Sequence, residues 1–129
     1  MQSHFRECSK RLKAGDLLIV GEDQDCPGIV AAAHLMFDQH LTTTFLAHVA
    51  AIGVSTTARG QGGKVADLTL EEVRQVIVEM ARDAGLCTAV ATANIHTRNR
   101  PSEMLFERAG FEPHSIPIGD YQRWICRLL

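Results

Sequence analysis

A glycine-rich segment between an apolar run and a helical run places the strongest constraint on this chain. Residues 53–64 have the sequence GVSTTARGQGGK, in which three glycines fall within four positions. Glycine has no Cβ, so consecutive backbone N–H groups can turn inward in such a loop. A helix that begins directly after the loop adds its own free N–H groups, and this arrangement favours an anion, usually a phosphate. Arg59 and Lys64 bring positive charge to the same place. The segment therefore predicts an anion-binding turn at a strand-to-helix junction.

Two common phosphate motifs are absent from this loop. Val65 follows Lys64, so there is no G-x-x-x-x-G-K-[ST], and no G-x-G-x-x-G is present. The missing hydroxyl after Lys64 counts against a magnesium-nucleotide site. A solvated turn is the alternative interpretation, because most glycine-rich loops are only turns. Three glycines in four positions are, however, costly in chain entropy.

Length and composition limit the classes of protein. The chain has 129 residues, which suits one domain over 1–129 with a real core. A hydrophobic content of 46% and a charged content of 22% are typical of globular proteins. The net charge of −2 disfavours nucleic acid and anionic membrane as partners, and weakly favours a small cationic ligand. No apolar run is long enough for a bilayer and no signal-peptide core is visible, so a cytoplasmic location is expected.

Cysteine and histidine spacings give no metal signature. Cys8, Cys26, Cys87 and Cys126 form no C-x-x-C pair, and the six histidines form no H-E-x-x-H. We expect reduced thiols and no metal site.

The first half of the chain predicts strands after a short helix. Phe5, Cys8 and Leu12 recur at helical spacing, which predicts an amphipathic helix closed by Gly15. Three β-rich segments follow, at residues 17–20, 29–37 and 43–54. Their connections are too short for crossovers, so they predict an antiparallel meander.

A long helix is predicted after the glycine loop. Its apolar positions share one face: Leu70, Val73, Ile77, Met80, Ala81 and Ala84. Thr69 and Asp67 are alternative N-caps, and Gly85 is a natural stop.

The chain then predicts a strand at 86–95, a short helix at 99–111, a loop at 112–120 and a strand at 121–128. The crossover through the long helix makes strand 86–95 parallel to strand 43–54. This order predicts a mixed α/β domain with its ligand at the carboxyl end of strand 43–54.

Two segments resemble the GCN5-related N-acetyltransferase (GNAT) superfamily, which transfers an acyl group from acyl-CoA to an amine. The family's pyrophosphate loop, [QR]-x-x-G-x-[GA], is similar to residues 59–64, with Lys64 replacing the last small residue. The family's second segment is N-x-x-[AS]-x-x-L-[YF]-E-x-x-G-F. It is matched in register by Asn99, Ser102, Leu105, Phe106, Glu107, Gly110 and Phe111.

The resemblance covers residues 16–128 and implies a GNAT-like fold, in which antiparallel N-terminal strands precede a parallel pair that splays at the CoA site. Family members usually begin with a strand and two helices, whereas one helix is expected here. The N-terminal part is therefore short for the family, and a homodimer is one way to cover the sheet edge and apolar surface this leaves.

The resemblance also implies the residues that bind acetyl-CoA. Pantetheine would pair with the end of strand 43–54, and the Ile52 N–H would stabilise the oxyanion that develops on attack. The glycine loop would hold the pyrophosphate, Asn99 the pantetheine arm and Phe106 the sulfur end. The implied cofactor-binding residues are Ile52, Gly53, Val54, Arg59, Gly60, Gln61, Gly62, Gly63, Lys64, Asn99, Ser102 and Phe106.

His48 is the candidate general base. Many members have a Glu six residues before the Val that closes the strand, and His48 occupies that position. Histidine suits proton transfer near neutral pH. The alternative is a strand histidine satisfied by a backbone carbonyl, and His34 is a weaker second candidate. Phe106 replaces a Tyr that often serves as the acid for the thiolate, and Tyr121 is the only tyrosine in the chain.

The resemblance thus implies an N-acetyltransferase that moves an acetyl group from acetyl-CoA to a primary amine of a small molecule or protein. An alternative is a catalytically weak CoA-binding module, suggested by the short N-terminal part, Phe106 and Lys64. A nucleotide-binding domain that uses the loop for another phosphate is a third. CoA binding that excludes ATP, and acetyl transfer to an amine, distinguish these alternatives.

Overall fold

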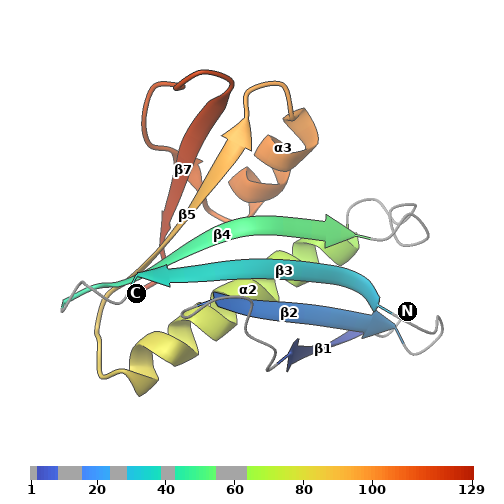
Figure 1. Cartoon of the computed structure of the whole chain (residues 1–129), viewed down its shortest axis with the longest axis vertical. Helices are drawn as coiled ribbons and strands as arrows, with labels where there is room; N and C mark the ends of the chain where they lie inside the picture. The colour runs from blue at the N-terminus through green and yellow to red at the C-terminus, as the bar shows by residue number, and fades with distance from the viewer. Residues whose placement is uncertain (1–2, 9–15, 24–28, 39–42, 55–63) are drawn as a thin grey trace.

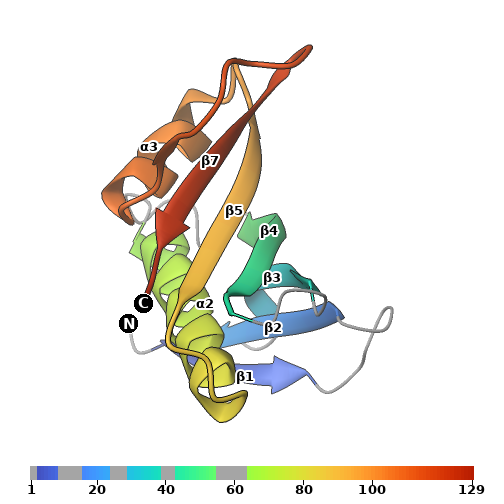
Figure 2. The ribbon, with the colours of Figure 1, turned by 90° about the vertical axis from the view of Figure 1, so that its left-hand side faces the viewer.

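The chain folds around one mixed sheet with two described helices on one of its faces. The computed structural model describes residues 3–8, 16–23, 29–38, 43–54 and 64–129. Seven strands form the sheet in the order β1-β2-β3-β4-β5-β7-β6 (Figures 1 and 2). They are β1 (Ser3–Cys8), β2 (Asp16–Asp23), β3 (Ile29–Asp38), β4 (Phe45–Val54), β5 (Ala89–His96), β6 (Glu112–Pro113) and β7 (Tyr121–Arg127). The helices are α2 (Lys64–Asp83) and α3 (Arg100–Arg108).

The predicted meander and crossover are confirmed. Strands β2, β3 and β4 pair antiparallel in sequence order, and β5 joins β4 in parallel after α2. Strand β7 then pairs antiparallel with β5. The segment predicted as a loop after α3 holds the two-residue strand β6, which pairs with β7.

The prediction of a helix near the N-terminus is wrong for the described part of that segment. Ser3–Cys8 is strand β1, paired antiparallel with β2 from Ser3↔Asp23 to Cys8↔Leu18. A helix this short is marginal by itself, whereas the open edge of β2 offers a row of backbone partners. The described sheet therefore includes a strand where the sequence spacing had predicted a helix.

Helix α2 begins earlier than either expected cap. It starts at Lys64, so Asp67 lies in its first turn and Thr69 lies inside it. Thr69 is buried, and its Oγ1 donates to the Val65 carbonyl at 2.7 Å. The expected stop is confirmed, since Gly85 has φ of 75° and lies two residues after Asp83, the last residue of the helix.

The core lies between the sheet and the helices. Leu70, Val73 and Ile77 of α2 are fully buried against strands whose inward positions include small residues. Ala33, Ala47 and Ala91 are each at most 2% exposed, so α2 can lie close to the sheet. No helix among the described residues is long and apolar enough to cross a membrane.

The sheet opens between β4 and β5. Their parallel pairing runs from Phe45↔Ala89 to Val49↔Ala93 and then stops. At the same point β4 carries one extra residue, because Leu35 pairs with Val49 whereas His34 pairs with Ala51. Such a bulge bends a strand and increases its twist. Strand β5 stays paired with β7 as far as His96↔Tyr121, so the two parts of the sheet diverge beyond the bulge (Figures 1 and 2).

Candidate functional site

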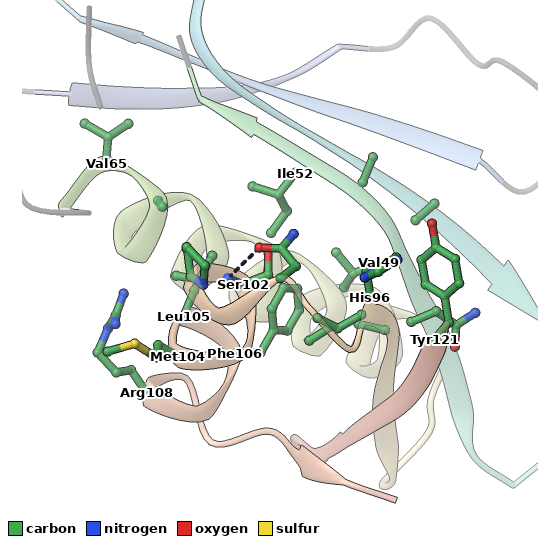
Figure 3. Close-up of a pocket in the computed structure, with 18 residues that line it drawn as sticks. Val49, Ile52, Val65, His96, Ser102, Met104, Leu105, Phe106, Arg108 and Tyr121 are labelled. Atoms are coloured by element: carbon green, nitrogen blue, oxygen red, sulfur yellow. Dashed lines mark hydrogen bonds between the residues drawn. The ribbon is translucent and has the colours of Figure 1, made fainter. Parts of the chain in front are cut away.

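A pocket of about 910 Å³ occupies the opening between β4 and β5. Figure 3 shows Val65 and Arg108 at one end, His96 and Tyr121 at the other, and Ile52, Ser102 and Phe106 between them. The pocket is lined by Val49, Ala50, Ala51, Ile52, Val65, Ala66, Ala93, Asn94, Ile95, His96, Asn99, Pro101, Ser102, Met104, Leu105, Phe106, Arg108 and Tyr121. The walls are mainly apolar with a few polar groups, which is the usual character of a ligand site.

The unpaired part of β4 forms one wall. From Ala50 onward β4 keeps its partner β3 on one edge but has lost β5 on the other. Backbone groups that point toward this open edge need partners from a ligand or solvent. An extended ligand with amide groups can therefore pair with this edge as an added strand would.

The first turn of α2 forms one end of the pocket. Val65 and Ala66 line it, and the free N–H groups of a helix start favour an anion there. Arg108 lines the same end and is held by Asp67, whose Oδ1 accepts from Arg108 Nε at 3.1 Å and from Nη2 at 2.9 Å. This ion pair is half-exposed, so it contributes little to stability. It fixes a guanidinium beside the helix start and connects α3 to α2.

Helix α3 forms the second wall. Asn99 is its N-cap, with Oδ1 accepting from the Ser102 N–H at 3.2 Å. The carboxamide oxygen is thus used by the helix, while the NH₂ group remains a donor on a residue that lines the pocket. Phe106 is 6% exposed and packs edge to face on Phe111, with ring centroids 5.0 Å apart.

Residues from both faces of the sheet line the pocket. Side chains of a strand alternate between faces, and the pocket is lined by consecutive residues of both β4 and β5. Ala93 and Ile95 are buried on the helix side, whereas Asn94 and His96 lie on the opposite face, where they are more exposed. A ligand between the strands near Val49 and Ala93 can therefore contact groups from both faces of the sheet.

His48 lies on the face away from the helices. Its Nδ1 is 2.9 Å from Thr92 Oγ1, a side chain of β5 directly opposite in register. Burial lowers the pKa of His48, and the positive charge of Arg123 and the His34 side chain lower this pKa further. The imidazole is consequently neutral near pH 7. If Nδ1–H donates to Thr92, the Nε2 lone pair is free to accept a proton.

The expected alternative for His48 was a bond to a backbone carbonyl, and the structure gives it a side-chain partner instead. His48 does not itself line the pocket. It precedes Val49, which does, at the last paired position before the strands part.

The structure brings together part of the expected cofactor-binding set. Ile52, Asn99, Ser102 and Phe106 line the pocket, and Lys64 is the first residue of α2. Gly53 and Val54 continue β4 beyond the lining residues. Five residues of the expected set lie outside the described residues: Arg59, Gly60, Gln61, Gly62 and Gly63.

Several side chains at or near the pocket were not predicted as site residues. Arg108 and Tyr121 line the pocket, Thr92 bonds His48, and Arg123 acts on His48 through its charge. Their sequence context gave no signal, because each reaches the site through a strand or helix partner far away in sequence. Among the described residues no three His, Cys, Asp or Glu side chains are grouped as metal ligands would be.

The chain was compared with known proteins. No protein-family model and no curated protein matches it. The IAA acetyltransferase from Bacillus cereus ATCC 14579 superposes with a TM-score of 0.72 at 12% identity, over 98% of this chain and 99% of that one. An acetyltransferase of the GNAT family from Streptococcus pneumoniae superposes with a TM-score of 0.61 at 14% identity, over 90% of this chain and 68% of that one. The chain has the GNAT fold.

A third GNAT-fold structure was solved with a ligand. Arabidopsis thaliana NAA60, in complex with acetyl-CoA, superposes with a TM-score of 0.70 at 11% identity, over 98% of this chain and 97% of that one. The resemblance suggested by residues 59–64 and 99–111 is therefore confirmed for the fold, including the predicted splay of the parallel strand pair.

Proposed function

We propose that the protein is an N-acetyltransferase that moves an acetyl group from acetyl-CoA to an amine. The observation that carries this proposal is the bulge at Ala50, where β4 leaves β5 and the opening is bounded by the start of α2 and the cap of α3. The GNAT fold supports it, as does the acetyl-CoA found in one protein of the same fold.

Each region of the site has groups that can bind one part of acetyl-CoA: the pyrophosphate, the pantetheine arm or the thioester. The start of α2 and the glycine loop before it suit the pyrophosphate. The open edge of β4 suits the amides of the pantetheine arm, and the Asn99 NH₂ group is a further donor to them. The Ile52 N–H is proposed to donate to the thioester oxygen, where negative charge develops during attack.

His48 is proposed as the general base. During transfer the amine nitrogen forms a bond to the thioester carbon, and the carbon–sulfur bond breaks. His48 Nε2 takes the proton that the amine loses, directly or through one water molecule. Phe106 has no hydroxyl, so the departing thiolate takes its proton from water or, by way of His48, from the amine. Thr92 orients the ring by accepting from Nδ1–H.

An acetyl-transfer assay tests this proposal. Wild-type protein is incubated with acetyl-CoA and a panel of amines, and product mass and free thiol are measured together. His48→Ala is expected to lower kcat by about 100-fold, the low end of general-base contributions. Acetyl-CoA binding without transfer to any amine would favour the weakly catalytic CoA-binding module instead. A homodimer also stays a prediction, which light scattering after size-exclusion chromatography would test.

A further inference from the structure

We infer that the acceptor is an amine of low basicity, specifically an α-amino group rather than a lysine-type ε-amino group. The inference rests on the proposed function and names the substrate class for that same site. It follows from three features of the face that carries His48: the setting of the base, the charges that surround it, and the lining of the pocket.

The setting of His48 makes it a weak base. The ring is half-buried in the sheet and held by Thr92, and its pKa lies below the ordinary value, chiefly because of burial. Proton transfer is most efficient between groups of similar pKa. A base whose pKa is lowered takes a proton from an α-ammonium group, with an ordinary pKa of about 8, more readily than from an ε-ammonium group, with an ordinary pKa of about 10.4. His48 is therefore matched to an amine that is already partly neutral.

The charges around His48 oppose a cationic acceptor. Strand β3 contributes His34, and β7 contributes Arg123, whose Nε donates to Asn94 Oδ1 at 3.3 Å. Strand β5 contributes the neutral groups Thr92 and Asn94 and, farther along the same face, His96. On the β5 side of His48, the first described carboxylate in its register row is Glu112 of β6, two strands beyond β5. Asn94 lines the pocket, so its bond places the permanent charge of Arg123 beside the opening. An ammonium group that approached His48 would be repelled by this guanidinium.

The described lining of the pocket offers no compensating anion. It contains no Asp or Glu, and its charged residue, Arg108, is basic. Among the described residues Arg123 itself has no carboxylate partner. The net charge of −2 had weakly favoured a small cationic ligand. The charges near the base favour the opposite, an acceptor that reaches His48 as a neutral amine.

Two peptides of the same sequence provide the test. The first has a free α-amino group and an acetylated lysine; the second has an acetylated N-terminus and a free lysine. At pH 7.5 the α-amine is neutral on the order of 100 times more often than the ε-amine. We expect kcat/KM for the first peptide to exceed that for the second by at least this factor. Its rise with pH should level off near pH 8, where the α-amine has lost its proton.

Reversing one charge tests the cause of the preference. Arg123→Glu puts an anion beside His48, so kcat/KM for the ε-amine peptide should rise. The ratio of kcat/KM between the α-amine and ε-amine peptides should therefore fall at least tenfold. Arg127→Glu is the matched control. Arg127 is exposed on the same strand and face, four residues from Arg123, and its Nε donates to the Leu129 carbonyl. This control should leave the ratio unchanged.

Equal or faster acetylation of the ε-amine peptide would overturn the inference, and so would transfer to a simple alkyl amine when neither peptide reacts. Both results would leave the acetyltransferase proposal standing. Failure of that proposal has separate signs, which are absence of acetyl-CoA binding to the folded protein, or acetyl-CoA binding without transfer to any amine. If Arg123→Glu and Arg127→Glu change the ratio of kcat/KM between the peptides equally, Arg123 is not the cause of the preference.

Discussion

The Nδ1 atom of His48 lies 2.9 Å from Oγ1 of Thr92, and this bond joins β4 to β5 one residue before the two strands part. The last paired position is Val49↔Ala93, so the bond sits at the vertex of the opening. His48 does not line the pocket but directly precedes Val49, which does, so the bond lies next to the place where the proposed reactants would meet. The relationship thus connects the bulge, a feature of the fold, to the proposed base.

The first prediction concerns Thr92. Thr92→Val keeps the shape of the side chain but removes the oxygen that accepts from Nδ1–H, so the ring can turn or change tautomer. We expect kcat to fall about tenfold, which corresponds to one lost hydrogen bond in the transition state. Thr92→Ser keeps the hydroxyl and should retain most of the activity. Equal activity in the Val and Ser variants would show that Thr92 does not position His48.

The second prediction concerns pH. Transfer needs neutral His48, and its lowered pKa keeps it neutral down to pH values below about 6.5. Activity should therefore fall as pH drops through this pKa. With an α-amine acceptor, log kcat/KM should rise with a slope of one below about pH 8. The slope should become two below the pKa of His48, where two groups must each lose a proton.

His48→Ala is the control for this profile, because its slope should stay at one over the whole range. A wild-type slope of one at all pH values below 8 would contradict a role for His48 as the base.

The third prediction concerns the proton that the thiolate receives. Tyr121 lines the pocket but is 54% exposed and lies at the end beside His96, where the ring centroids are 5.2 Å apart (Figure 3). Phe106, at the expected sulfur end, has no hydroxyl. Tyr121→Phe should therefore leave kcat within about twofold. A loss of 100-fold or more, which is the size of a general-acid contribution, would instead identify Tyr121 as the acid.

The fourth prediction concerns the register of α2. Leu70 is fully buried and Leu68 is 42% exposed, although they are only two residues apart on the helix. Leu70→Ala should lower the free energy of unfolding by about 2–5 kcal/mol, because it leaves a cavity in the core. Leu68→Ala should change it by less than about 0.5 kcal/mol. Denaturant unfolding of both variants measures the difference in the free energy of unfolding. Equal losses of this free energy would contradict the burial of Leu70 and the exposure of Leu68 on the helix.

The strand order and crossover could be predicted because each rests on a local pattern. Strand segments 17–20, 29–37 and 43–54 are short, β-rich and closely spaced, and the apolar face of α2 is periodic. Two further features had ambiguous patterns. Residues 5–12 have helical spacing, yet Ser3–Cys8 pairs with the edge of β2. Thr69 starts a capping pattern, but the same hydroxyl can bond the carbonyl four residues before it inside a helix.

The arrangement around the candidate base could be predicted only in part. The position of His48 in the chain suggested its role through the resemblance. The bulge at Ala50 has no compositional signature, because it is one extra residue in an ordinary alanine-rich strand. Thr92 and Arg123 are 44 and 75 residues from His48 along the chain. They approach it only because β4, β5 and β7 are neighbours in the sheet.

The central claim is that acetyl-CoA binds in the opening between β4 and β5, and calorimetric titration tests it most directly. Ser102 is half-buried in the wall of the pocket, whereas Ser115 is exposed and does not line it. The titration uses acetyl-CoA, with ATP as a control ligand, on the wild type, Ser102→Trp and Ser115→Trp. We predict that the wild type and Ser115→Trp bind acetyl-CoA equally and do not bind ATP, and that Ser102→Trp binds acetyl-CoA at least tenfold more weakly. No binding to the folded wild type, or equal binding by all three proteins, would contradict the account.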